Sequence, residues 1–213
     1  MVRPVLSLFV VEVFSGFYLA VGVGAAVAWR ATTPRSAEPT RVKARAEPAR
    51  WAEAAWMGGA MVMVLWPLGV LAVPEYAYGW PTVPSFPFSE AIQLSGFALS
   101  LVGGLLFFTA ARALGKHLRP TIQVEEGHRL VQEGPYQYIR HPVYTAAALV
   151  GFGLSILYLS PVLASIVLLL VGIAHYRARM EESLLSSEKA FGREYVGYMA
   201  RTGRFLPRLR ARQ

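Results

Sequence analysis

Long apolar stretches separated by short polar connections dominate this chain up to about residue 176. Most approach the roughly 20 residues with which an α-helix crosses the ~30 Å hydrocarbon core of a bilayer. They cover approximately residues 5–29, 56–73, 92–114, 143–159 and 161–176. Because almost no chain separates the last two, they are expected to form a tight helical hairpin. The pattern predicts an all-α integral membrane protein with about five transmembrane helices, in which residues 1–213 form one membrane-embedded domain.

The composition and the distribution of charge agree with a membrane setting. Hydrophobic residues make up 54% of the 213 residues and charged residues only 16%. Lys and Arg gather in residues 30–50, in residues 112–140 and after residue 177, whereas residues 74–90 contain none. Since short cytosolic loops collect Lys and Arg, we expect the N-terminus outside and the C-terminus in the cytosol. Basic loops beside anionic headgroups also account for the formal net charge of +8, so the expected partner is the lipid bilayer and not nucleic acid.

Two features of the N-terminal part bear on this topology. Glu12 lies inside the first apolar stretch, and a carboxylate there can mark an ion or substrate path. The preferred interpretation starts the span after Glu12, which leaves the charge at the interface. Residues 31–50, rich in Pro, Thr, Ala and charge, are interpreted as a linker.

The polar groups that could carry chemistry are concentrated in two expected cytosolic segments, residues 115–142 and 177–207. In the first, residues 121–124 are expected to be extended, and Gly134 and Pro135 predict a turn. In the second, Arg177 stands four residues before Glu181, which by itself indicates an ordinary ion pair on a solvated helix end. The residues that follow Phe191 predict a short amphipathic helix and an ordered tail over the cytosolic mouth.

A proline marks the point where the first polar segment enters the fourth apolar stretch. Pro142 suits the first position of a helix, and it steers His141 out of the α region and towards the N-cap. The helix N-terminus, together with Arg140 and His141, then offers donors and positive potential to an anion. We therefore expect an anion site at the membrane surface, where a water-soluble cofactor could meet a substrate dissolved in lipid.

Several separated motifs then resemble one family of membrane enzymes in both order and spacing. They are Gly127-His128-Arg-Leu-Val, Glu133-Gly-Pro-Tyr, Ile139-Arg-His-Pro-Val-Tyr144, Glu181-Glu182-Ser-Leu-Leu, Phe191-Gly-Arg-Glu-Tyr-Val-Gly-Tyr198 and Thr202-Gly-Arg-Phe-Leu-Pro207. This set is similar to the isoprenylcysteine carboxyl methyltransferase (ICMT) family. The resemblance implies S-adenosylmethionine in a cytosolic pocket formed by the loop before the fourth span and roofed by the C-terminal segment, with a lipid-facing tunnel for the substrate. Two departures concern the register of the C-terminal lid: the interval before Phe191 is about two residues longer than in the family, and Leu118 stands where an aromatic residue is common.

The resemblance also implies which residues surround the cofactor. They are His128, Leu130, Val131, Gly134, Tyr136, Arg140, His141, Pro142, Tyr144 and Glu182, to which the chemistry of the cofactor adds Tyr138 and Glu181. S-adenosylmethionine carries one carboxylate and two cationic groups, an ammonium and a sulfonium. Arg140 and His141 suit the carboxylate, and Glu182 or Glu181 suits a cation. The aromatic and aliphatic side chains suit adenine, and no metal is implied.

The expected reaction is methyl transfer to a lipophilic small molecule or prenylated substrate, with an isoprenylcysteine-like carboxylate as the preferred acceptor. A carboxylate is already ionised at neutral pH, so the reaction needs no general base. It does require that the acceptor and the methyl donor be held in line. Arg201 and Arg204 are the candidates to orient the acceptor, and with Glu182 they form the expected catalytic set. If the acceptor were a thiol or an amine, His128 or Glu181 could supply a base.

Three alternatives stay open at this stage. The first is methylation of another lipophilic acceptor, such as a thiol or a phospholipid amine, on the same scaffold. The second is a nicotinamide-dependent membrane reductase, since sterol reductases have a distantly similar C-terminal portion. The third is a non-catalytic scaffold or transporter, in which small residues only pack helices together. These residues are Gly22, Ala26, Gly96, Gly103 and Gly104. The sequence does not indicate an oligomeric state.

Overall fold

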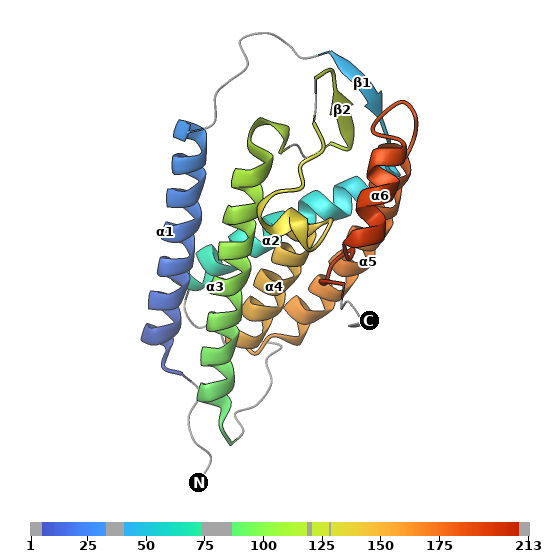
Figure 1. Ribbon diagram of the computed structural model, residues 1–213. Coiled ribbons are helices and arrows are strands. Elements are labelled where there is room, and N and C mark those ends of the chain that lie inside the picture. The colour runs from blue at the N-terminus through green and yellow to red at the C-terminus, as the bar shows by residue number, and fades with distance from the viewer. Residues whose placement is uncertain (1–5, 33–40, 74–86, 119–120, 128, 209–213) are drawn as a thin grey trace, which may run out of the picture.

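The computed structural model describes residues 6–32, 41–73, 87–118, 121–127 and 129–208. Long helices make up most of this part of the chain. They are α1 (Leu8–Thr32), α2 (Arg50–Ala72), α3 (Ser89–Leu114), α4 (Pro142–Leu157) and α5 (Pro161–Leu185). Figure 1 shows them assembled into one bundle, with the small polar elements gathered at one end.

The apolar stretches predicted from the sequence are all helical. Among the described residues, α2, α3 and α5 are long and apolar enough to cross a membrane, and Phe9–Gly24 and Pro142–Leu157 are shorter apolar helical runs. Large apolar side chains such as Phe9, Leu105 and Leu168 are exposed on the bundle surface, as expected where lipid is the solvent. The chain is therefore an integral membrane protein, and a count of five spans stays a prediction. Two helices extend furthest beyond the apolar stretches: α2 already begins at Arg50, and α5 continues to Leu185.

Close packing against α3 fixes the position of α4, the helix that begins at the Arg-His-Pro motif. A Cβ atom at Gly153 would lie 2.5 Å from the backbone nitrogen of Ser100, and one at Gly103 would lie 2.7 Å from that of Val150. Small residues allow two helix backbones to approach this closely. Gly96 faces the same contact, whereas open space surrounds Gly22 and Gly104. Of these glycines, Gly96 and Gly103 therefore do pack helices together.

A two-stranded antiparallel sheet corrects two sequence-based expectations. β1 (Val42–Arg45) pairs with β2 (Gln123–Glu125), with Val42 opposite Glu125 and Arg45 opposite Gln123. The fold is thus not purely α-helical, and residues 42–45 within the expected linker form a strand. No local pattern predicts this pairing, because the two strands are about 80 residues apart in sequence and each satisfies the backbone groups of the other. The sheet brings the first and third connections together at one end of the bundle, as the charge pattern requires (Figure 1).

The C-terminal segment folds back onto the same end. After α6 (Arg193–Arg201), the tail forms a parallel bridge in which Gly203 lies beside Ile139. The backbone N–H of Arg140 donates to the carbonyl of Gly203 at 2.8 Å, and the N–H of Gly203 donates to the carbonyl of Tyr138 at 3.1 Å. The predicted amphipathic helix is confirmed as α6. The predicted ordered tail is also confirmed, since main-chain bonds tie it to the residues that precede α4.

Candidate active site

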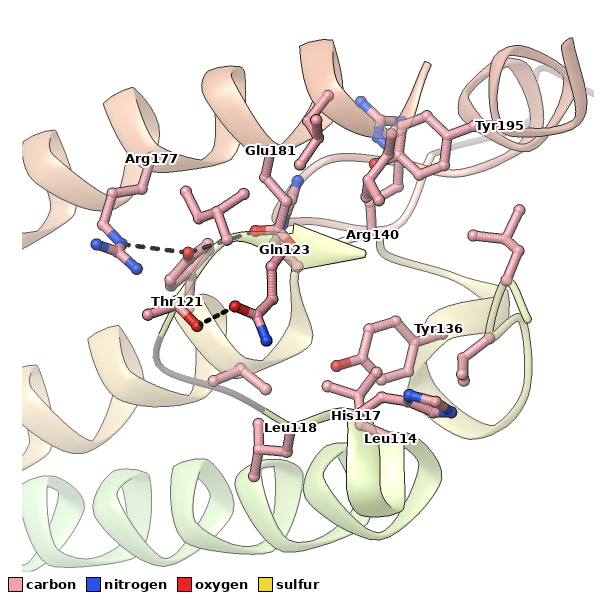
Figure 2. Close-up of a pocket in the computed structure, with 18 of the residues that line it drawn as sticks. Leu114, His117, Leu118, Thr121, Gln123, Tyr136, Arg140, Arg177, Glu181 and Tyr195 are labelled. Carbon is pink, nitrogen blue, oxygen red and sulfur yellow. Dashed lines mark hydrogen bonds and ion pairs between the residues drawn. The ribbon is translucent and has the colours of Figure 1, made fainter. Parts of the chain in front are cut away.

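A cavity of about 540 Å³ lies at the end of the bundle where the sheet, the tail and α6 meet. Its walls come from α2, α3, β2, the short 3-10 helix η3 (Gly134–Gln137), α4, α5 and α6. Figure 2 shows the polar lining residues: Arg177 lies at one end of the view, Tyr136 and Tyr195 lie at the other, and Glu181 lies between them. Segments that are far apart in sequence therefore build one cavity.

One end of this cavity is aromatic and aliphatic. Tyr136 and Tyr195 lie at this end in Figure 2, Tyr198 contacts both of them, and Leu130 and Val131 also line the cavity. The Tyr198 hydroxyl donates to the Tyr136 carbonyl at 2.6 Å, and the rings of Tyr195 and Tyr198 lie 5.7 Å apart. Burial raises the pKa of Tyr136 and Tyr195 well above the usual value and raises the pKa of Tyr198 to about 12. All three phenols therefore stay neutral at physiological pH and add aromatic surface to the lining.

Glu182 is the centre of a buried ion-pair network. Its side chain is 8% exposed, and its carboxylate accepts from Arg140 Nε at 2.8 Å and from Arg204 Nη2 at 2.5 Å. Arg204 Nε lies 3.1 Å from both carboxylate oxygens, and His141 Nε2 lies 3.3 Å from Oε1. The hydrogen bond to Glu182 raises the pKa of Arg204, so this arginine stays charged. The network joins the start of α4, the end of α5 and the tail.

The neighbouring carboxylate has a different environment. Glu181 lines the cavity, its side chain is 32% exposed, and its Oε2 accepts from the Tyr144 hydroxyl at 3.4 Å. His141 Nδ1 lies 3.6 Å from the same oxygen. Successive residues of an α-helix point about 100° apart, so only one of two adjacent glutamates can face the cavity squarely. Of the two carboxylates left open by the sequence, Glu181 faces the cavity and Glu182 faces the arginines.

The structure brings seven of the sequence-predicted cofactor residues together around the cavity. They are Leu130, Val131, Tyr136, Arg140, His141, Tyr144 and Glu181. Four others lie near it without lining it. Gly134 begins η3 with a positive φ of 57°, Pro142 is buried at the first position of α4, Tyr138 is exposed, and Glu182 is turned to its arginines. His128 lies outside the described residues.

The two arginines expected to orient an acceptor have other described contacts. Arg201 is exposed, and its Nη2 donates to Gln132 Oε1 at 3.1 Å. Arg204 forks onto Glu182. Neither is among the residues that line the cavity. Arg204 therefore ties the tail to α5, Arg201 contacts Gln132 outside the cavity, and the arginines that line the cavity are Arg140 and Arg177.

Sequence reasoning missed several lining residues. They are Trp56, His117, Thr121, Gln123, Arg177, Phe191, Tyr195 and Tyr198. The amphipathic pattern of α6 could have identified Tyr195 and Tyr198, because they are its buried positions. Arg177 was interpreted as a pair on a solvated helix end, yet it is buried and contacts Tyr144 and Glu53.

The backbone donors before α4 are partly used by the protein itself. The N–H of Arg140 donates to Gly203, and the N–H of His141 donates to the carbonyl of Arg204 at 3.0 Å. His141 does occupy the N-cap position of α4, as predicted, but its imidazole turns towards the glutamates and does not cap the helix. Side chains, rather than these two amides, therefore present the positive charge to the cavity.

Known proteins resemble much of the part of the chain that builds this cavity. The model of the isoprenylcysteine carboxyl methyltransferase (ICMT) family matches residues 96–187. Protein-S-isoprenylcysteine O-methyltransferase B of Arabidopsis thaliana is 30% identical over 140 residues, which cover 65% of this chain and 71% of the relative. The chain belongs to the isoprenylcysteine carboxyl methyltransferase family.

Other members of this family are more distant or longer. The protein-S-isoprenylcysteine O-methyltransferase of Rattus norvegicus is 28% identical over 130 residues, which cover 60% of this chain but only 44% of the rat protein. The solved structure of the eukaryotic intramembrane Ras methyltransferase ICMT superposes with a TM-score of 0.52 at 22% identity, over 73% of this chain and 50% of that chain. The chain thus shares a fold with ICMT, while it spans less than half of the rat relative.

Proposed function

We propose that this chain transfers a methyl group from S-adenosylmethionine to the carboxylate of a lipophilic, isoprenylcysteine-like acceptor. One observation carries the proposal: a single cavity joins a polar, aromatic end to apolar side chains of the membrane helices. The apolar part of the lining includes Trp56 and Ala60 of α2, Phe107 of α3 and Ala147 of α4. A water-soluble cofactor and a lipid-dissolved acceptor can therefore reach the same space from different solvents.

The lining suits the charges of S-adenosylmethionine. Tyr136 and Tyr195, with Leu130 and Val131, offer the apolar faces that adenine requires. Glu181 offers a carboxylate to the ammonium or sulfonium, and the guanidinium of Arg140 and the imidazole of His141 offer hydrogen-bond donors to the cofactor's carboxylate. When bound, the cofactor supplies an electrophilic methyl group. The S–CH₃ bond breaks as the acceptor oxygen forms the new O–CH₃ bond, and the electron pair stays on sulfur.

The protein's own contribution to this reaction is alignment in a water-poor site. The acceptor carboxylate is ionised at neutral pH, so no residue has to remove a proton. Holding two reactants in line can supply much of the rate enhancement of such a displacement. The Glu182 network supports this role, because it fixes the tail across the start of α4 through Arg140 and Arg204. We assign Glu182 to that structural task and Glu181 to the cofactor.

The siting of the reaction at the cytosolic face is part of the same proposal. The pairing of β1 with β2 supports it, because the two basic connections then share one side of the membrane with the tail. In this arrangement the chain has five spans, the N-terminus lies outside and the C-terminus lies in the cytosol. The acceptor would enter from the inner leaflet.

A direct assay tests the proposal. Purified protein in detergent is incubated with radiolabelled S-adenosylmethionine and, in parallel, N-acetyl-S-farnesylcysteine, lipophilic thiols and a phospholipid extract. We expect base-labile label, which is typical of a methyl ester, on the prenylcysteine. Label only on a thiol or amine would overturn the carboxylate acceptor, and no label together with tight binding of a nicotinamide dinucleotide would overturn methyl transfer itself.

A further inference from the structure

Resting on the cytosolic siting in the proposed function, we propose that β1 binds anionic lipid headgroups of the inner leaflet and thereby steadies the part of the cavity wall that its partner strand, β2, supports. The basic side chains of β1 and of the residue before it, Arg41, Lys43 and Arg45, are all exposed. β1 lies outside residues 96–187, the part of the chain that the family model matches. The strand also contributes no residue to the cavity lining, so this lipid contact is separate from the site of the reaction.

β1 lies close to the level at which headgroups are expected. Residues 46–49 alone separate it from Arg50, where the candidate membrane span α2 begins. Trp51 is 63% exposed and stacks on Tyr176 of α5 with ring centres 6.0 Å apart, and the Tyr176 hydroxyl accepts from the backbone N–H of Ala49 at 3.3 Å. Trp and Tyr side chains at the end of a span are typical of the headgroup region. The basic side chains just before α2 are therefore within reach of lipid phosphates.

The local charge suits a lipid phosphate. Residues 41–50 contain four basic residues and a single acidic one, Glu47. Glu47 lies 3.9 Å from Arg45, and the two side chains are 79% and 52% exposed, so water screens this pair. A cluster of Lys and Arg immediately cytosolic of a membrane helix is typical of a site for anionic lipid, and each such residue near the surface strengthens binding by about five-fold. The strand thus keeps a net positive charge to offer to headgroups.

β1 is the outer strand of its sheet and covers a buried partner. Ile122 and Val124 are 5% and 2% exposed, whereas the basic side chains of β1 are exposed. Main-chain hydrogen bonds hold both ends of the pairing. The N–H of Ala46 donates to the carbonyl of Ile122 at 2.9 Å, and the N–H of Glu126 donates to the carbonyl of Arg41 at 3.0 Å. A contact that holds β1 in place therefore also holds the chain around β2.

The chain around β2 forms part of the cavity wall. Thr121, Ile122 and Gln123 line the cavity, and the Thr121 hydroxyl donates to Gln123 Oε1 at 3.2 Å (Figure 2). A ligand that orders one part of a protein lowers the entropy that a second ligand has to remove, so the two bind cooperatively. Headgroups bound to β1 should therefore tighten the binding of the cofactor, although the two sites do not touch.

The test uses the protein in nanodiscs of phosphatidylcholine alone or mixed with phosphatidylglycerol. Calorimetry measures affinity for S-adenosylhomocysteine, whose net charge is close to zero, so its accumulation at a charged surface does not account for a difference. Affinity should be about five-fold higher with phosphatidylglycerol, the lower end of typical couplings between two sites. High salt should remove the difference, because it screens exposed charges.

Hydrogen exchange supplies a second measurement, which needs neither cofactor nor variant. Peptides that contain Ala46 and Glu126 should exchange more slowly in the anionic nanodiscs, because both amides belong to the pairing of β1 with β2. Neither inorganic phosphate nor a poly-glutamate peptide should reproduce this protection, or the gain in affinity, in nanodiscs of phosphatidylcholine.

Two triple variants locate the site. Arg41→Gln, Lys43→Gln and Arg45→Gln together should abolish both effects of phosphatidylglycerol. The matched control, which combines Lys189→Gln, Arg193→Gln and Arg208→Gln, removes the same charge from exposed positions in the C-terminal segment and should keep both effects.

Three results would overturn the lipid site: identical behaviour of the wild type in the two lipid mixtures, equal losses in the two triple variants, or the same effects from phosphate or poly-glutamate. Slower exchange with unchanged affinity would overturn the link to the cavity. A wild type that binds no S-adenosylhomocysteine in any lipid would contradict the proposed function instead, and hydrogen exchange then still decides the lipid contact.

Discussion

Arg204 Nη2 lies 2.5 Å from Oε2 of Glu182, which ties the C-terminal tail to the last turns of α5. Arg140 meets the other oxygen of the same carboxylate, so one glutamate binds two arginines from separate segments. This contact makes the tail part of the folded structure around the site.

Stability should depend strongly on this carboxylate. Glu182→Gln is expected to destabilise the protein by about 3 kcal/mol, because removing one partner of a buried ion pair leaves charge uncompensated. Arg204→Ala should cost only about 1 kcal/mol, since its side chain is 30% exposed and water screens the pair. Thermal unfolding in detergent, followed by circular dichroism, measures both effects, with the exposed Arg193→Ala on α6 as control. Equal stability of Glu182→Gln and wild type would show that the network does not hold the tail.

The adjacent glutamate should behave in the opposite way. Glu181→Gln is expected to weaken binding of S-adenosylmethionine by roughly 1.5–3 kcal/mol, the range for a hydrogen bond to a charged group. Its thermal unfolding should stay close to that of wild type, because Glu181 is partly exposed and joined to Tyr144 by a long contact of 3.4 Å. Calorimetric titration of Glu181→Gln and Glu182→Gln with S-adenosylmethionine checks this division of roles between the two glutamates. Normal cofactor affinity in Glu181→Gln would remove Glu181 from the cofactor site.

The aromatic end of the cavity should contribute through ring stacking. Tyr195→Leu keeps an apolar side chain but loses the flat face, so cofactor affinity should fall by about 0.5–1.5 kcal/mol. The neighbouring Val196 is exposed on the outer side of α6, and Val196→Leu should bind the cofactor as wild type does. Fluorescence or calorimetric titration with S-adenosylhomocysteine distinguishes the two. Wild-type cofactor affinity in Tyr195→Leu would show that adenine does not stack on this tyrosine of α6.

Membrane topology can be determined in this cysteine-free chain with single cysteines. Lys43→Cys on β1 and Ser187→Cys after α5 should be shielded from an impermeant thiol reagent in intact cells, because both lie on the end assigned to the cytosol. Glu90→Cys, an exposed position in the first turn of α3, should react. All three should react after the membrane is permeabilised. Labelling of Ser187→Cys from outside, with Lys43→Cys shielded, would contradict a site built from both segments.

Local sequence was sufficient to predict the helices and the proline motif at which α4 begins. The predicted apolar stretches correspond to the helices α1 to α5. Pro142 and Pro161 stand at the first positions of α4 and α5 because a proline lacks the N–H that this position leaves unused. The amphipathic pattern also predicted α6, although its buried tyrosines were not assigned to the site from the sequence. The ordered motifs around Arg140, His141 and the paired glutamates are also sufficient to indicate the family.

Only the tertiary structure decided what each charged side chain does. The strand within residues 31–50 forms because its partner, β2, lies next to it in space, and no local propensity encodes that neighbour. Arg201 and Arg204 face Gln132 and Glu182, whereas Arg177 faces the cavity, although all three are arginines in expected cytosolic segments. Helical periodicity fixes the angle between Glu181 and Glu182, but the packing of α5 against α4 and the tail decides which of them points inward. The sequence by itself determined the helices, the membrane setting and the family, since these follow from local pattern; the division of roles within the site depended on contacts between segments far apart in the chain.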